Sequence, residues 1–193
     1  MNDNTFHTIP ENLEAIELDT ENSGFSMSSD RKIGSLLSTL AAAKPDGHFL
    51  ELGTGTGLAT SWLLLGMNQS ALLDSVDNDQ EVLEIARRHF DRDKRVTFHN
   101  CDGGDFITRE QPDTYDLIFA DAWPGKYSLL DETLALLKVG GIYVIDDMSP
   151  QPNWPEGHAD KAKHLLGKFN RCSHLKMCRL AWATGIVICC RTE

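Results

Sequence analysis

The chain has 193 residues, of which 41% are apolar and 24% charged, and its net charge is -11. This length favours a single compact domain, and the composition is that of a soluble globular protein. Because the charge is negative and no Lys/Arg-rich block exists, a phosphate backbone is a poor partner, so we expect a small-molecule partner and no nucleic acid.

Targeting and redox features are sparse. No apolar run reaches the roughly 18 residues that a membrane span requires, and the opening MNDNTFHTIP lacks the basic start and apolar stretch of a signal peptide. The five cysteines form no C-x-x-C pair. We therefore expect a cytoplasmic protein without membrane contact, and the sequence is compatible with a homodimer.

The first 25 residues are polar and are interpreted as an N-terminal extension. Ser29 or Asp30 is expected to cap a helix from Arg31 towards Ala43. After this helix, strand patterns alternate with helix patterns. The predicted strands are 48–52, 71–76, 96–100, 115–121 and 142–146, and the predicted helices between them are 58–65, 80–90 and 129–138.

Two of these helices carry N-terminal capping signals. Asp79 is placed to cap the helix 80–90, and Ser128 with Asp131 has the spacing of a capping box before the helix 129–138. In the helix 80–90, apolar residues form one stripe, which indicates a single buried face. That stripe consists of Val82, Ile85, Ala86 and Phe90.

The strand runs at 117–120 and 142–145 are apolar throughout, which is typical of strands covered on both faces. Near the end, a helix is expected from about Ala159 to Phe169, followed by two strands joined at a tight turn that contains Thr184 and Gly185. The sequence therefore predicts an α/β fold: a doubly wound, Rossmann-like, seven-stranded sheet, mostly parallel, with a C-terminal antiparallel hairpin.

We interpret the whole chain as one domain in three parts. After the extension 1–25, residues 26–149 form the cofactor-binding core, and residues 150–193 form a C-terminal loop, helix and hairpin.

Glycines alternate at positions 53, 55 and 57 in the stretch FLELGTGTGLATSWLL, where the strand 48–52 meets the helix 58–65. Glycine weakens either element by up to ~1 kcal/mol relative to alanine, so this loop must turn sharply or admit a ligand closely. Ligands of doubly wound sheets bind beyond the carboxyl ends of the strands, where this loop lies. Asp77, at the end of the next strand, is placed to accept hydrogen bonds from a ribose diol.

A dinucleotide site is built in a similar way. Its pattern G-x-G-x-x-G requires glycine at position 58, where this chain has Leu58. Glu51, two residues before the first glycine, also suits a cationic ligand better than a pyrophosphate. A nicotinamide-dependent oxidoreductase stays an alternative, as does a non-catalytic protein that keeps the cofactor fold for binding.

The stretch from Glu51 to Gly57 reads E-x-G-x-G-x-G, and in this it resembles the first motif of the class I S-adenosylmethionine-dependent methyltransferases. Acidic residues after the second, third and fourth strands match as well. The resemblance implies S-adenosylmethionine as the cofactor. The residues expected to bind it are Glu51, Gly53, Thr54, Gly55, Gly57, Asp77, Asn78, Asp102, Gly103 and Asp121.

Within this class, the segment YDLIFADAWPGKYSLLDETLALLKVGGIYVIDDM resembles the catechol and caffeoyl-CoA O-methyltransferase family. The resemblance implies O-methylation of a small hydroxylated or aromatic molecule, with Asp121, Asp146 and Asp147 holding a divalent cation such as Mg²⁺. Asp147 stands where Asn is usual. Pro124 replaces the family's lysine, which leaves Lys126 as the nearest amine, so Asp121 and Lys126 are the expected catalytic residues.

The predicted topology gives a physical reason for the cation. Asp121 and Asp146 end adjacent parallel strands, and clustered carboxylates repel one another unless a cation or protons intervene. The alternative is that Asp147 faces solvent and Asp146 caps a turn. Trp123, Trp154 and the loop 149–158 are candidates to wall an aromatic acceptor or simply to pack, and His158 is expected to start a helix rather than act as a base.

Overall fold

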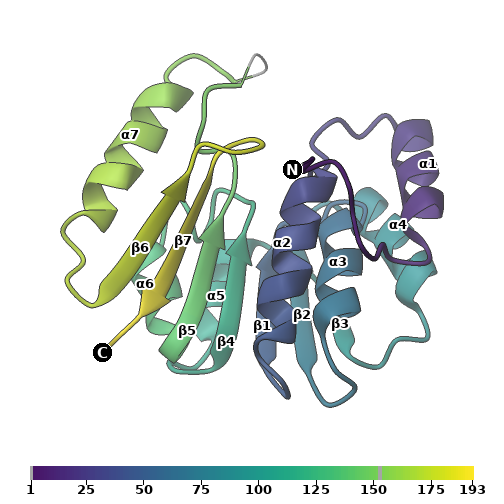
Figure 1. Cartoon of the computed structure of the whole chain (residues 1–193), viewed down its shortest axis with the longest axis horizontal. Helices are drawn as coiled ribbons and strands as arrows, with labels where there is room; N and C mark the ends of the chain where they lie inside the picture. The colour runs from purple at the N-terminus through teal and green to yellow at the C-terminus, as the bar shows by residue number, and fades with distance from the viewer. Residues whose placement is uncertain (1, 152–153) are drawn as a thin grey trace.

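The computed structural model describes residues 2–151 and 154–193, and in them a seven-stranded sheet separates two layers of helices (Figure 1). The strand order is β3-β2-β1-β4-β5-β7-β6. The first five strands pair in parallel, and β7 is antiparallel to both β5 and β6. The strands are β1 (His48–Leu52), β2 (Leu72–Asp77), β3 (Val96–Asn100), β4 (Tyr115–Ala120), β5 (Leu137–Ile145), β6 (Leu175–Leu180) and β7 (Ile186–Arg191). The predicted doubly wound sheet with a terminal antiparallel hairpin is confirmed.

Helices cover both faces of the sheet. They are α1 (Leu13–Ser23), α2 (Arg31–Ala42), α3 (Leu58–Gly66), α4 (Gln80–Phe90), α5 (Gly103–Arg109), α6 (Leu130–Ala135) and α7 (His158–Phe169). One face carries α1, α2 and α3, and the other carries α5, α6 and α7 (Figure 1). Within the described residues, no helix combines the length and hydrophobicity that crossing a bilayer requires.

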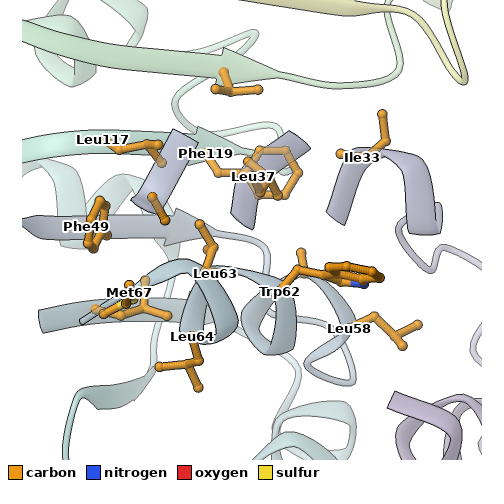
Figure 2. Close-up of a cluster of buried hydrophobic side chains, with 14 of the residues drawn as sticks. Ile33, Leu37, Phe49, Leu58, Trp62, Leu63, Leu64, Met67, Leu117 and Phe119 are labelled. Atoms are coloured by element: carbon orange, nitrogen blue, oxygen red, sulfur yellow. The ribbon is translucent and has the colours of Figure 1, made fainter. Parts of the chain in front are cut away.

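The apolar strand runs are explained by this double cover. Phe49, Leu117 and Phe119 point towards α2 and α3 and belong to the same buried cluster as Leu37 and Trp62 (Figure 2). The alternate residues of the same strands pack against the opposite helical layer. Because successive side chains of a strand point to opposite faces, a strand buried on both faces is apolar at every position.

Local signals set several of the helix starts as predicted. The Asp30 carboxylate accepts a hydrogen bond from Lys32 N at the start of α2. The Asp79 carboxylate accepts from Glu81 N and Val82 N at the start of α4. The predicted stripe of α4 is buried. These caps satisfy backbone N–H groups that have no partner within the helix.

Two helices lie where the sequence analysis expects none. In the N-terminal extension, α1 buries Leu13 and Ile16 against the core, and Thr20 Oγ1 lies 2.7 Å from Thr56 Oγ1 in the glycine loop. After β3, Asp102 accepts hydrogen bonds from Gly104 N and Asp105 N and thereby caps α5.

The predicted helix 129–138 is wrong in its length and in its cap. Leu129 has φ +54 and precedes α6 without a side-chain cap, so the capping box of Ser128 and Asp131 does not form. The helix ends at Ala135, and β5 starts at Leu137, five residues earlier than predicted. The pairing of β4 with β5 is irregular between Tyr115 and Leu117, because β5 accommodates a glycine pair there.

Candidate functional site

A cavity of about 470 Å³ lies at the carboxyl ends of β1, β2 and β4. The strand order reverses between β1 and β4, which is where doubly wound sheets bind their ligands. The predicted cofactor residues that line the cavity are Gly53, Thr54, Gly55, Asp77, Asn78, Asp102, Gly103 and Asp121. The structure thus brings together eight of the ten predicted positions.

The glycine loop is fixed to the end of β2. Gly55 has φ +53, and its N–H donates a hydrogen bond of 2.8 Å to Asp77 Oδ2. The other carboxylate oxygen of Asp77 accepts from Asp79 N at 2.9 Å. Both Asp77 oxygens are therefore oriented by backbone N–H groups at the wall of the cavity.

The other two predicted positions, Gly57 and Glu51, are outside the cavity lining among the described residues. Gly57 has φ +93, and a Cβ there would lie 3.0 Å from Ala86 Cβ and 3.1 Å from the Phe90 ring. The third glycine of the motif is therefore required for the close approach of the glycine loop to α4.

Glu51 is fully buried beneath the glycine loop. Its Oε2 accepts hydrogen bonds from the hydroxyl groups of Thr60 and Ser75, and Oε1 has no partner among the described residues. Burial raises the pKa of Glu51 to about 7, although the two hydroxyl donors oppose this shift. Glu51 thus links the end of β1 to β2 and α3 through buried hydrogen bonds.

The segment between α1 and α2 also lines the cavity, and the sequence analysis did not identify it. Phe25, Met27, Ser28 and Ser29 contribute from this side. A Cβ on Gly55 would lie 3.1 Å from the Phe25 ring, so the aromatic side chain closely covers the glycine loop. Phe25 and Met27 are apolar residues in an otherwise polar stretch, and they were the sequence signal for this part of the cavity wall.

Asp121 follows β4 and lines the cavity opposite Asp77. Ser29 Oγ donates a hydrogen bond of 3.3 Å to Asp121 Oδ2. Desolvation raises the pKa of Asp121 well above its usual value, the nearby carboxylate of Asp146 adds to this shift, and the Lys126 ammonium opposes it.

Lys126 comes from the tight loop that follows Asp121. Its side chain is only 4% exposed, and Nζ donates a hydrogen bond to the backbone oxygen of Asp146. Desolvation lowers the pKa of Lys126, and the carboxylates of Asp121, Asp147 and Asp146 oppose this shift. This buried amine therefore lies among the three predicted metal ligands.

Asp146 itself is 3% exposed. Its Oδ1 accepts hydrogen bonds from Asp147 N, at 2.7 Å, and from Thr184 Oγ1 in the β6–β7 turn. Burial raises the pKa of Asp146 to about 6, and these two hydrogen bonds oppose the shift.

The donor set does not fit the predicted cation. Across residues 2–151 and 154–193, no three Asp, Glu, His or Cys side chains are grouped so that they could hold a metal ion. Asp146 uses its Oδ1 and its backbone oxygen in hydrogen bonds within the chain. The prediction that Asp121, Asp146 and Asp147 together bind Mg²⁺ therefore has no support in the geometry.

A second cavity, of about 440 Å³, lies beside the first. Trp123 lines both, and Lys161 Nζ lies 3.9 Å from the centroid of the Trp123 ring. The second cavity is lined by Trp123, Lys126, Tyr127, Ser128, Asp160, Lys161, His164, Leu165 and Lys168. It therefore offers an aromatic wall and a buried amine next to the glycine-loop cavity.

The other two predicted residues, His158 and Trp154, pack near the aromatic side chains of the second cavity. His158 begins α7, as predicted, and its Nε2 lies 2.9 Å from Tyr127 Oη. Trp154 packs on His158 with ring centroids 4.5 Å apart. Residues 152 and 153 of the predicted acceptor loop lie outside the described residues.

Comparison with known proteins agrees with this geometry. Residues 50–148 match the family described as methyltransferase domain. Proteins of Mycobacterium ulcerans and Mycobacterium leprae that are named as O-methyltransferases are each 33% identical over 118 residues, which is 58% of this chain and 53% of theirs. The chain thus spans about half the length of these relatives.

The fold recurs in solved structures. The O-methyltransferase of Bacillus cereus in complex with S-adenosylhomocysteine superposes with a TM-score of 0.85 at 16% identity, covering 97% of this chain and 94% of that one. TomG of Streptomyces achromogenes, an O-methyltransferase of tomaymycin synthesis in complex with S-adenosylmethionine, gives 0.82 at 19% identity, covering 95% and 90%.

Proposed function

Because this chain belongs to the methyltransferase domain family, we propose that it is an S-adenosylmethionine-dependent O-methyltransferase of small hydroxylated or aromatic molecules. The observation that carries the proposal is the pair of adjoining cavities that share Trp123. The first contains the glycine loop and Asp77 and would hold the cofactor. The second contains Lys126 and two aromatic side chains and would hold the acceptor.

The cofactor would be held mainly by the first cavity. Asp77 accepts hydrogen bonds through both oxygens already, and its remaining lone pairs suit a ribose diol. Asn78, Asp102 and Gly103 extend the polar wall from the ends of β2 and β3. Among the described residues, Glu51 and Gly57 are outside the cavity lining, and they would act indirectly, through the packing around the glycine loop.

Bound S-adenosylmethionine would supply a methyl group that its sulfonium makes electrophilic. An acceptor oxygen would bond to the methyl carbon while the carbon–sulfur bond breaks, and the hydroxyl proton must leave. Alignment of the two reactants lowers the reaction barrier by up to ~7 to 11 kcal/mol. A general base accelerates the reaction by ~10² to 10⁴-fold, which is a smaller effect. The protein's main task is therefore to position the acceptor.

Asp121 and Lys126 are the residues proposed for this task. Lys126 lines the acceptor cavity and would orient the acceptor oxygen, and Asp121 lines the cofactor cavity. A carboxylate with a raised pKa is a stronger base than one in water, so Asp121 is the proposed proton acceptor. The divalent cation implied by the resemblance is not part of this proposal, since the residues present do not fit it.

The test is transfer of labelled methyl from S-adenosylmethionine to a panel of phenols, catechols and carboxylic acids, with Asp77→Ala as the cofactor-site control. We expect one class of acceptor to be labelled by the native chain and much less by the variant. Binding of S-adenosylhomocysteine without transfer to any acceptor would support a non-catalytic role. Tighter binding of NAD(H) than of S-adenosylhomocysteine would support an oxidoreductase.

A further inference from the structure

We propose that the Lys126 ammonium takes the place of a divalent cation at the ends of β4 and β5, so that the acceptor site is metal-independent and needs only one hydroxyl group on its acceptor. The acceptor part of this inference rests on the proposed function. The metal part rests on the side chains alone.

Three aspartates surround the Lys126 amine. Asp121, Asp146 and Asp147 would repel one another without a nearby positive charge, and Lys126 supplies one. Its Nζ donates to the backbone oxygen of Asp146, and the side chain is 4% exposed. A divalent ion in the same cluster would face a buried ammonium at close range, and the two cations would repel each other.

The backbone oxygen and Oδ1 of Asp146 are already engaged within the chain. Asp146 directs Oδ1 to Thr184 Oγ1 and to Asp147 N, so this oxygen is turned towards the protein. Asp147 has φ +55, a left-handed backbone. Among the described residues, the linings of the two cavities include neither of these aspartates. The described cavity linings therefore offer a metal no oxygen ligand from Asp146 or Asp147.

The loop after β4 places the Lys126 amine. Pro124 occupies the position of the resembled family's lysine, and Gly125 follows with φ +87. A Cβ on Gly125 would lie 2.5 Å from Leu52 Cδ1, so the backbone packs directly on β1. Tyr143 Oη donates to Gly125 O and holds the loop from β5. The loop therefore turns the Lys126 side chain inward, towards the end of β5.

The Lys126 ammonium keeps hydrogen-bond donors for an acceptor. An ammonium has three N–H donors, of which the contact with Asp146 uses one. Lys126 also lines the second cavity beside Trp123 and Tyr127, so another donor can meet an acceptor oxygen there. A single point donor binds one oxygen, whereas chelation by a metal selects two adjacent hydroxyls. The chemical class expected is a small aromatic molecule with one hydroxyl.

The metal part is tested without turnover. The native chain, stripped with EDTA and then freed of it, is titrated with Mn²⁺, and free Mn²⁺ is followed by electron paramagnetic resonance. We expect no stoichiometric site. Lys126→Met has similar length but no charge, and it is expected to bind Mn²⁺ more tightly than the native chain. A stoichiometric Mn²⁺ site in the native chain that Asp146→Asn removes would overturn the inference.

The acceptor part is tested by methyl transfer to 4-hydroxybenzoate and to 3,4-dihydroxybenzoate, each with and without EDTA. We expect the monophenol to be methylated and EDTA to change neither rate. Lys126→Met should slow transfer by ~10² to 10³-fold, the effect of removing one positioned hydrogen-bond donor, with unchanged affinity for S-adenosylhomocysteine, and Lys126→Arg should restore part of the rate. Loss of transfer in EDTA that Mg²⁺ restores would overturn the inference.

The outcomes separate the two proposals. If neither acceptor is methylated although S-adenosylhomocysteine binds, the proposed function fails, and the Mn²⁺ titration alone decides the metal part. If Lys126→Met does not fold, as judged by circular dichroism, the native chain with and without EDTA still decides both parts.

Discussion

Gly55 N donates a hydrogen bond of 2.8 Å to Asp77 Oδ2, which ties the glycine loop to the end of β2. A hydrogen bond to a charged group contributes ~1.5 to 3 kcal/mol, so Asp77→Ala is expected to weaken S-adenosylhomocysteine binding by roughly 10 to 150-fold in calorimetry. Asp105→Ala makes the same charge change at an exposed position on α5 and should leave the Kd unchanged. Equal affinities of all three proteins, each folded, would remove Asp77 from the site.

Gly57→Ala is expected to destabilise the fold by more than its backbone conformation alone costs. A left-handed residue other than glycine costs roughly 1 to 2 kcal/mol. At Gly57 the added Cβ also meets Ala86 and Phe90. Urea unfolding measures the difference from Gly24→Ala, whose φ is +73 but whose Cβ would have no neighbour within 4 Å among the described residues. Equal losses in the two variants would show that contact with α4 does not require the glycine.

Glu51→Gln is expected to stabilise the protein at pH 8 and to change little at pH 5. The pKa of Glu51 is raised from 4.5 to about 7 on folding. The folded state therefore binds this proton more tightly, and the resulting stability is present below pH 4.5 and is lost as the pH rises through 7. Above pH 7 the buried charge costs about 3 kcal/mol, which a neutral amide avoids.

Thermal unfolding of Glu51→Gln at the two pH values is compared with Glu132→Gln, an exposed site on α6. The stability gained by Glu51→Gln should be larger at pH 8 than at pH 5. The stability change caused by Glu132→Gln should be the same at both pH values. A pH-independent difference at position 51 would mean that its carboxyl titrates like one in water.

Thr184→Val is expected to destabilise the protein by about 1.5 to 3 kcal/mol at pH 8, because it removes a hydrogen bond to an ionised buried carboxylate. The pKa of Asp146 is about 6, so at pH 5 the carboxyl is protonated and the loss should be smaller. Denaturant unfolding at both pH values measures this, and Thr184→Ser, which keeps the hydroxyl, is the control. The same loss at both pH values would exclude an ionised partner.

The sheet and much of the lining of the first cavity could be predicted because local sequence determines them. Strands buried on both faces must be apolar at each position, as at Leu117 and Phe119, and a loop that adopts positive φ needs glycine, as at Gly53 and Gly55. The residues that follow each strand then meet at one edge whatever the details of packing.

The two missed helices depend on tertiary contacts instead. In α1 only Leu13, Ile16 and Thr20 are buried, which is too sparse an apolar stripe to read in isolation. In α5 the first two residues are glycines, which disfavour a helix, and the Asp102 cap compensates.

The surroundings of Lys126 in the second cavity could not be predicted, because they depend on the direction in which one loop turns one side chain. The resembled family has a lysine three residues after the position that corresponds to Asp121. Here the turn at Gly125 brings Lys126, two positions later, to the backbone of Asp146. Leu129 then enters α6 with φ +54 in place of a capped start. Neither conformation is set by local propensity.

The turn between β6 and β7 has a consequence for how the chain is made. The first cavity is lined by residues 25–124, so its whole wall is synthesised well before Thr184, which completes the surroundings of Asp146. β7 (Ile186–Arg191) pairs with β5. Until β7 is synthesised and pairs there, β5 is an open edge of the sheet. Pairing of β7 therefore covers the open edge of β5 and, through the adjoining turn, brings Thr184 to Asp146.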